Sequence, residues 1–176
     1  MLFGHKRSGP ELKEEIAEAT ATILRSKNVH EAKEPLFRIR KAFKEASGRC
    51  SLSVYETSYN PEGNAISPDM AADCINDCER TRQFLRGLRE AIRTAQERFH
   101  GEVIQVLYAG CGPYGTLAIP LMCGEFKPDE VQFTLVDIHS ASIESVKAII
   151  EKLGIRNHVP KLTHDNAITY KHDGIS

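Results

Sequence analysis

Long hydrophobic runs are missing from this sequence of 176 residues, which also contains no tryptophan. Its longest apolar stretches, Val103 to Ala109 and Leu117 to Cys123, are far shorter than the roughly 20 residues that a membrane-spanning helix requires. The N-terminal residues lead directly into a charged segment, Glu11 to Glu15, and lack the apolar centre of a secretion signal. We therefore expect no membrane partner and a cytoplasmic location.

An excess of charge of one sign is also absent. Lysine and arginine together number 23, and aspartate and glutamate number 24, so the formal net charge is only -1. Such a balanced chain has no general electrostatic attraction for nucleic acids. The cysteine count of five is odd, which favours free thiols over a disulfide framework. Only Cys74 and Cys78 form a spaced pair, and because no other Cys or His stands at ligand spacing, we predict no metal site.

The first part of the chain has helical periodicity. Apolar residues recur at steps of three and four over residues 11–27, and again from Pro35 to Ala46, which predicts two helices. The segment from Cys50 to Ser67 has no sustained period and contains a turn sequence at residues 60–64, which predicts a loop. Ser67 and Pro68 are typical of a helix start, and the apolar stripe after them predicts one long helix that reaches about residue 99.

Strands and helices alternate in the rest of the chain. β-Branched and apolar runs predict strands at 103–109, 131–137 and 158–162, with helices at 115–122 and 140–153 between them. This order predicts an α/β fold in which about three parallel strands are joined by right-handed crossovers. We therefore divide the chain into an all-helical N-terminal region, residues 1–66, and an α/β region, residues 67–176.

A glycine-rich segment, Gly110-Cys111-Gly112-Pro113-Tyr114-Gly115, follows the first predicted strand. Its Gly-x-Gly-x-x-Gly spacing allows the backbone to approach a ligand closely. Asp137 ends the next predicted strand, where a carboxylate can accept hydrogen bonds from ribose hydroxyls. Because the carboxyl ends of neighbouring parallel strands meet at one edge of a sheet, the two features together predict a site for a nucleotide-like cofactor.

The segment Val106 to Gly115 resembles the first motif of class I S-adenosylmethionine (SAM)-dependent methyltransferases, in which Gly-Cys-Gly-Pro is frequent. The resemblance implies a Rossmann-like fold, SAM as the cofactor and methyl transfer as the reaction. It also implies a role for two sets of residues: a SAM cradle of Ala109, Gly110, Cys111, Gly112 and Gly115, and adenosine contacts from Asp137, Ile138, Asp165 and Asn166. In the second set, Asp137 would hold the ribose hydroxyls, Ile138 would lie against the adenine, and Asp165 or Asn166 would contact the adenine amine.

Two further positions, Tyr108 and Arg80, bear on the methionine part of SAM. Many members of the family carry an acid two residues before the first glycine, where this chain has Tyr108, so another group is expected to hold the ammonium. The segment Asp77 to Phe84 is similar to the helix before the first motif of protein arginine methyltransferases, which implies that Arg80 pairs with the SAM carboxylate. The alternative is that Arg80, Arg82 and Arg86 form the solvated face of a helix.

The resemblance leaves the methyl acceptor and any catalytic base undefined. A full class I domain has more strands than the three or so predicted here, so we expect the chain to cover the cofactor-binding front part of such a domain. A protein is one candidate acceptor. An NAD-dependent oxidoreductase would share the glycine spacing and Asp137, and a non-catalytic module that keeps the fold is a third possibility. An open strand edge after residue 163 would favour self-association.

Overall fold

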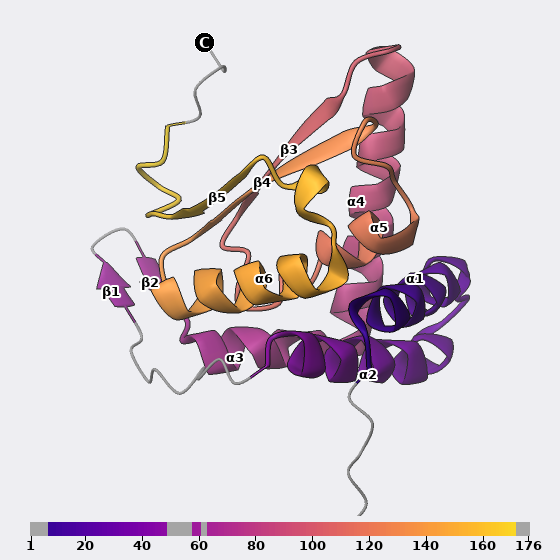
Figure 1. Ribbon diagram of the computed structural model, residues 1–176, viewed down its shortest axis with the longest axis horizontal. Helices are drawn as coiled ribbons and strands as arrows, with labels where there is room; N and C mark the ends of the chain where they lie inside the picture. Colours follow the sequence, from indigo (N-terminus) through magenta and orange to yellow (C-terminus); the bar gives the residue numbers. More distant parts are fainter. Residues whose placement is uncertain (1–6, 49–57, 61–62, 172–176) are drawn as a thin grey trace, which may run out of the picture.

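The computed structural model describes residues 7–48, 58–60 and 63–171. It is a mixed α/β structure in which a parallel sheet of three strands follows a set of helices, as predicted (Figure 1). The strands lie in the order β3 (Ile104–Ala109), β4 (Val131–Asp137) and β5 (Lys161–His164). The register pairs Ala109 with Val136 and Asp137 with His164, so the carboxyl ends of all three strands meet at one edge of the sheet.

Two N-terminal helices precede the sheet, α1 (Gly9–Arg25) and α2 (Val29–Ala46). A capping box starts α1, because the Ser8 side chain accepts a hydrogen bond from the Glu11 backbone while the Glu11 carboxylate accepts one from the Ser8 backbone. The predicted start of the second helix at Pro35 is wrong. Helix α2 begins earlier, at Val29, where the Asn28 side chain caps it. Pro35 is accommodated inside the helix, where its missing N–H removes one backbone hydrogen bond.

The single helix predicted from Ser67 to about residue 99 is also wrong. The structure has a short helix α3 (Pro68–Asp73), a 3-10 turn (Cys74–Asn76) and a long helix α4 (Cys78–Arg98). The break lies at Asp77, whose φ of -74° and ψ of 81° are not helical and whose carboxylate accepts a hydrogen bond from the Arg80 N–H at 3.1 Å. Asp77 therefore ends one helical path and caps the next.

Other boundaries shift by smaller amounts. Part of the loop predicted at 50–67 is an antiparallel hairpin, β1 (Ser58–Asn60) and β2 (Gly63–Ala65); residues 49–57 and 61–62 lie outside the described residues. Turns occupy residues 112–118, so the helix predicted at 115–122 is α5 (Ile119–Gly124). The strand predicted at 158–162 begins later, as β5, because a 3-10 turn (Arg156–His158) precedes it. Helix α6 (Ser140–Leu153) has its predicted bounds and ends at Gly154, whose φ is 66°.

One hydrophobic core joins the N-terminal helices to the sheet. Helix α6 lies between the sheet and the pair α1 and α2, while α1 also packs on α5, and α2 on α4 (Figure 1). Alternate residues of β3, including Tyr108, face this core, whereas Leu107 on the other face is 44% exposed. In the part of the chain that the structure describes, no helix has the length and apolar character needed to cross a bilayer.

Candidate functional site

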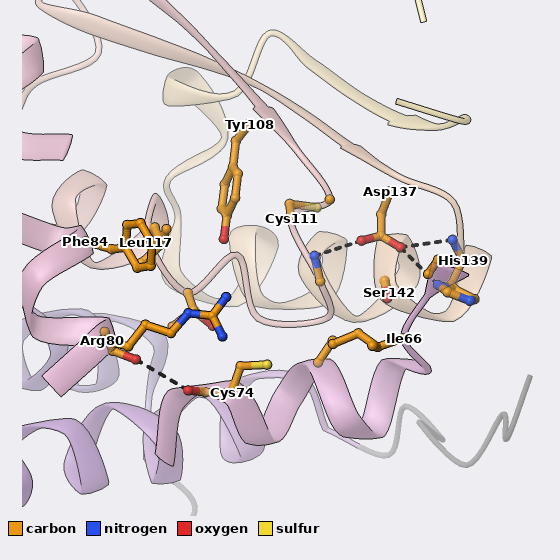
Figure 2. Close-up of a pocket in the computed structure, with 16 residues that line it drawn as sticks. Ile66, Cys74, Arg80, Phe84, Tyr108, Cys111, Leu117, Asp137, His139 and Ser142 are labelled. Carbon is orange, nitrogen blue, oxygen red and sulfur yellow. Dashed lines mark hydrogen bonds and ion pairs between the residues drawn. The ribbon is translucent and has the colours of Figure 1, made fainter. Parts of the chain in front are cut away.

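A cavity of about 430 Å³ lies at the carboxyl edge of the sheet (Figure 2). Its walls come from the loop after β3, the end of β4, the start of α6, helix α3 and the first turns of α4. Several predicted site residues line it together: Arg80, Gly110, Cys111, Gly112 and Asp137. Segments far apart in the sequence therefore converge on one concave surface of a size that suits a small molecule.

The glycine loop is held tightly by β4 and α6. Gly110 and Gly112 have φ values of 70° and 64°, a region that residues with a Cβ rarely adopt. The N–H groups of Gly110 and Cys111 both donate hydrogen bonds to the carbonyl oxygen of Val136, at 2.8 and 3.0 Å. From α6, the Ser145 hydroxyl donates to the Pro113 carbonyl oxygen at 2.7 Å. The loop is thus a rigid wall of the cavity.

Asp137 is oriented by backbone groups from both sides. Its carboxylate accepts hydrogen bonds from the Gly112 N–H at 2.8 Å and from the His139 N–H at 2.9 Å, and the His139 ring Nδ1 lies 3.4 Å from it. The residue is only 6% exposed, yet it lines the cavity. Because each carboxylate oxygen has two lone pairs, the two backbone donors leave room for hydroxyl groups of a ligand.

Arg80 reaches into the cavity from the first turn of α4 (Figure 2). Its guanidinium lies over the ring of Phe84, 5.7 Å from the ring centroid, and no carboxylate of the described residues is within ion-pair distance of it. Arg82 and Arg86 behave differently, because both donate hydrogen bonds to the carbonyl oxygen of Ser26 outside the cavity. The three arginines therefore do not form one solvated face, and Arg80 alone is directed at the cavity.

Five other predicted site residues are not among the residues that line the cavity: Ala109, Gly115, Ile138, Asp165 and Asn166. Gly115 belongs to the turn before α5. The backbone N–H of Asp165 donates to the Asp137 carbonyl oxygen at 3.0 Å, and the Asn166 side chain accepts from the Ile168 N–H at 3.0 Å. The hydrogen bonds of Asp165 and Asn166 shape the loop after β5. A contact between any of the five residues and a cofactor remains a prediction.

The structure adds cavity residues that the sequence reasoning did not select. Tyr108 directs its hydroxyl into the cavity, and burial raises the pKa of this phenol, as it raises the pKa of the Cys111 thiol (Figure 2). Both groups are therefore protonated at neutral pH. Ser142, in the first turn of α6, is buried on the cavity wall. The signal for it in the sequence is its spacing of three from Ser145, which places two hydroxyls on the otherwise apolar face of an amphipathic helix.

Charge is distributed unevenly over the cavity. Asp137 and Arg80 lie on opposite sides of it, and apolar side chains such as Ile66 and Leu117 form other parts of its wall (Figure 2). This arrangement can bind a ligand that has hydroxyl groups at one end and an anionic group at the other. No group of three or more His, Cys, Asp or Glu side chains within the described ranges is placed to hold a metal ion.

Comparison of the chain with protein-family models, with curated proteins and with solved structures finds no match. The function is therefore inferred from the chemistry of the cavity.

Proposed function

We propose that the chain binds SAM in this cavity and acts as a SAM-dependent methyltransferase or as the cofactor-binding part of one. The observation that carries the proposal is the placement of Asp137, an acceptor for hydroxyl groups, across the cavity from Arg80, a cation without a carboxylate partner in the described part of the chain. SAM carries ribose hydroxyls on one side of its sulfur and an α-carboxylate on the other. Asp137 can accept hydrogen bonds from the ribose hydroxyls, and Arg80, on the opposite side of the cavity, can pair with the carboxylate.

The state of the glycine loop favours SAM over a dinucleotide such as NAD. A pyrophosphate is usually bound by free backbone N–H groups at the start of a helix. Here the N–H groups of Gly110, Cys111 and Gly112 are already used inside the protein, and Pro113 has none. The helix that follows starts only at Ile119. SAM has no phosphate, so these features do not count against it.

The residues of this chain would bind and orient the cofactor. SAM, when bound, supplies an electrophilic methyl group, and its transfer depends mainly on holding donor and acceptor within reach. Asp137 would fix the ribose, and Arg80 would fix the carboxylate by a charge-assisted hydrogen bond. No residue is assigned as a catalytic base, and the methyl acceptor is of unknown class, with a protein as one candidate.

Location and assembly are part of the proposal. The free thiols of the described cysteines, Cys74, Cys78, Cys111 and Cys123, support a cytoplasmic location. In the described sheet, β3 and β5 each pair on one side only, and an open edge of this kind supports self-association. The balanced charge of the chain favours neither nucleic acid nor an anionic membrane surface as a partner.

Calorimetric titration with S-adenosylhomocysteine, the product of SAM, tests the cofactor assignment. We expect saturable binding by the unmodified chain and at least about tenfold weaker binding by Asp137→Ala, because a hydrogen bond to a charged group contributes roughly 1.5–3 kcal/mol. Asp129→Ala, which changes an exposed carboxylate not among the residues that line the cavity, is the matched control and should bind as the unmodified chain does. A parallel titration uses NAD. Binding of NAD alone, or of neither compound, would contradict the proposal.

A further inference from the structure

Ser142 has a buried hydroxyl group without a partner. Its side chain lies on the cavity wall beside Asp137, in the first turn of α6 (Figure 2). The residue is 1% exposed, and its Oγ makes no hydrogen bond in the described structure. A hydroxyl that has lost its hydrogen bonds to water without replacing them destabilises the folded state.

The neighbouring serine on the same helix face gives a direct comparison. Ser145 is 0% exposed and lies three residues further along α6, but its Oγ donates to the Pro113 carbonyl oxygen at 2.7 Å. Ser145 therefore has an evident structural role, which is to hold the glycine loop. Ser142 has no such role in the described structure, although it stands at the wall of a cavity that is large enough for a ligand.

We propose that the Ser142 hydroxyl is a binding contact for the adenosine end of the cofactor, next to Asp137. This inference rests on the proposed SAM site. A ribose carries two adjacent hydroxyl groups, and a serine can donate one hydrogen bond and accept others, so Ser142 complements the acceptor-only carboxylate of Asp137. Since Ser142 has a single side-chain torsion with three staggered positions, its Oγ can turn toward a ligand without movement of α6.

The test combines stability and binding for Ser142→Ala, with Ser145→Ala as the matched variant. Stability is measured as the urea midpoint of the ligand-free protein, and binding by calorimetric titration with adenosine and with S-adenosylhomocysteine. For Ser142→Ala we expect an unchanged or higher midpoint and about tenfold weaker binding of both compounds, by equal factors. For Ser145→Ala we expect a lower midpoint, because the Pro113 carbonyl oxygen loses its donor.

Two results would overturn the inference while the SAM site stands. One is unchanged affinity of Ser142→Ala for both compounds, which is also the result expected if only a water molecule occupies the place beside Ser142. The other is a midpoint of Ser142→Ala that falls as far as that of Ser145→Ala, which would make Ser142 a structural residue. If the unmodified chain binds neither compound, the proposed function and this inference fail together.

Discussion

Arg80 and Arg82 lie two residues apart on α4 and have opposite environments. Arg82 is 5% exposed, pairs with Glu79 at 2.9 Å and donates a hydrogen bond to the Ser26 carbonyl oxygen, so it ties α4 to the end of α1. Arg80 is exposed and directed at the cavity. We expect Arg82→Ala to lower the urea midpoint clearly, and Arg80→Ala to leave it unchanged while weakening binding of S-adenosylhomocysteine about tenfold.

Urea unfolding and calorimetric titration of both arginine variants check this prediction. Arg80→Lys is a useful third variant, because lysine keeps the charge but not the planar fork that binds a carboxylate in a bidentate manner. We expect its affinity to lie between those of the unmodified chain and Arg80→Ala. Equal losses of affinity in Arg80→Ala and Arg82→Ala would speak against a specific role of Arg80.

At the level of residues, the sequence predicts those site residues whose position follows from the local pattern of strands and turns. Gly110, Gly112 and Asp137 are predicted as site residues from their positions at strand ends, and all three line the cavity. Ser142 was not selected, because whether a buried hydroxyl finds a partner depends on which loop packs against its helix. For Arg80 the sequence allows both a cofactor contact and a place on a solvated helix face, since spacing alone does not distinguish a side chain directed at a cavity from one directed at solvent.

The break between α3 and α4 is the element that orients Arg80. The Asp77 carboxylate caps α4 by accepting from the Arg80 N–H, so the first turn of α4 and the Arg80 side chain are fixed together. We expect Asp77→Ala to lower the free energy of unfolding by about 0.5–2 kcal/mol, as for other N-caps, and to weaken binding of S-adenosylhomocysteine. Asp77→Asn, which keeps a capping oxygen, should retain most of the free energy of unfolding and most of the affinity for S-adenosylhomocysteine. A variant Asp77→Ala with unchanged stability would contradict the capping role.

Helices α1 and α5 approach each other closely at Gly124. A Cβ placed there would lie 2.7 Å from the Ala17 Cβ and 3.2 Å from the Ala17 Cα, which is too close for both helices to keep their present positions. We expect Gly124→Ala to lower the free energy of unfolding by about 1–3 kcal/mol. Gly87, inside α4, has open space around it, so Gly87→Ala should raise the free energy by about 0.4–1 kcal/mol. Urea unfolding of the two variants measures both effects, and a stabilised Gly124→Ala would contradict the close approach.

At the level of elements, periodicity predicts which segments are helical better than where they break. The apolar stripe runs from α3 across Asp77 into α4, so the spacing alone indicates one helix. The capping ability of Asp77 is a local sign of the break. Pro35 leads to the prediction of a helix start where the helix in fact continues, because proline is typical of a first helical turn. It is also tolerated further inside a helix when tertiary packing supports the helix.

At the level of the whole molecule, the order of strands and helices predicted the parallel sheet correctly. Alternation of strands and helices favours parallel pairing, and short connections favour neighbouring positions for strands that follow one another in the chain, as in the order β3-β4-β5. The sequence did not predict that α1 and α2 share one core with the sheet, because an apolar helix face does not identify the surface that covers it. Substitutions in the N-terminal helices should therefore affect the stability of the whole described fold.

His158 couples the stability of this shared fold to pH. It is buried at the start of the sheet, with its ring Nδ1 3.4 Å from the Val131 carbonyl oxygen. Burial lowers the pKa of His158 below its ordinary value of 6.5 and outweighs the hydrogen bond with the Val131 carbonyl, which raises it. The charge of Lys13 lowers the pKa further, and Asp129 and Glu130 oppose this more weakly. The folded protein thus binds this proton less tightly than the unfolded chain does.

The free energy of unfolding should therefore be highest above pH 6.5 and should fall as the pH decreases from 6.5 through the folded-state pKa of His158. Carboxylates act in a separate, more acidic range: hydrogen bonds from Arg82 and Gln83 lower the pKa of Glu79 from 4.5 to about 2, so its contribution is lost only below 4.5. Urea unfolding between about pH 7.5 and 5.5 isolates the histidine effect. His158→Asn, whose amide can still donate to Val131, should flatten this dependence, whereas His100→Gln, an exposed control, should not. An unchanged slope in His158→Asn would show that another group carries the acid sensitivity.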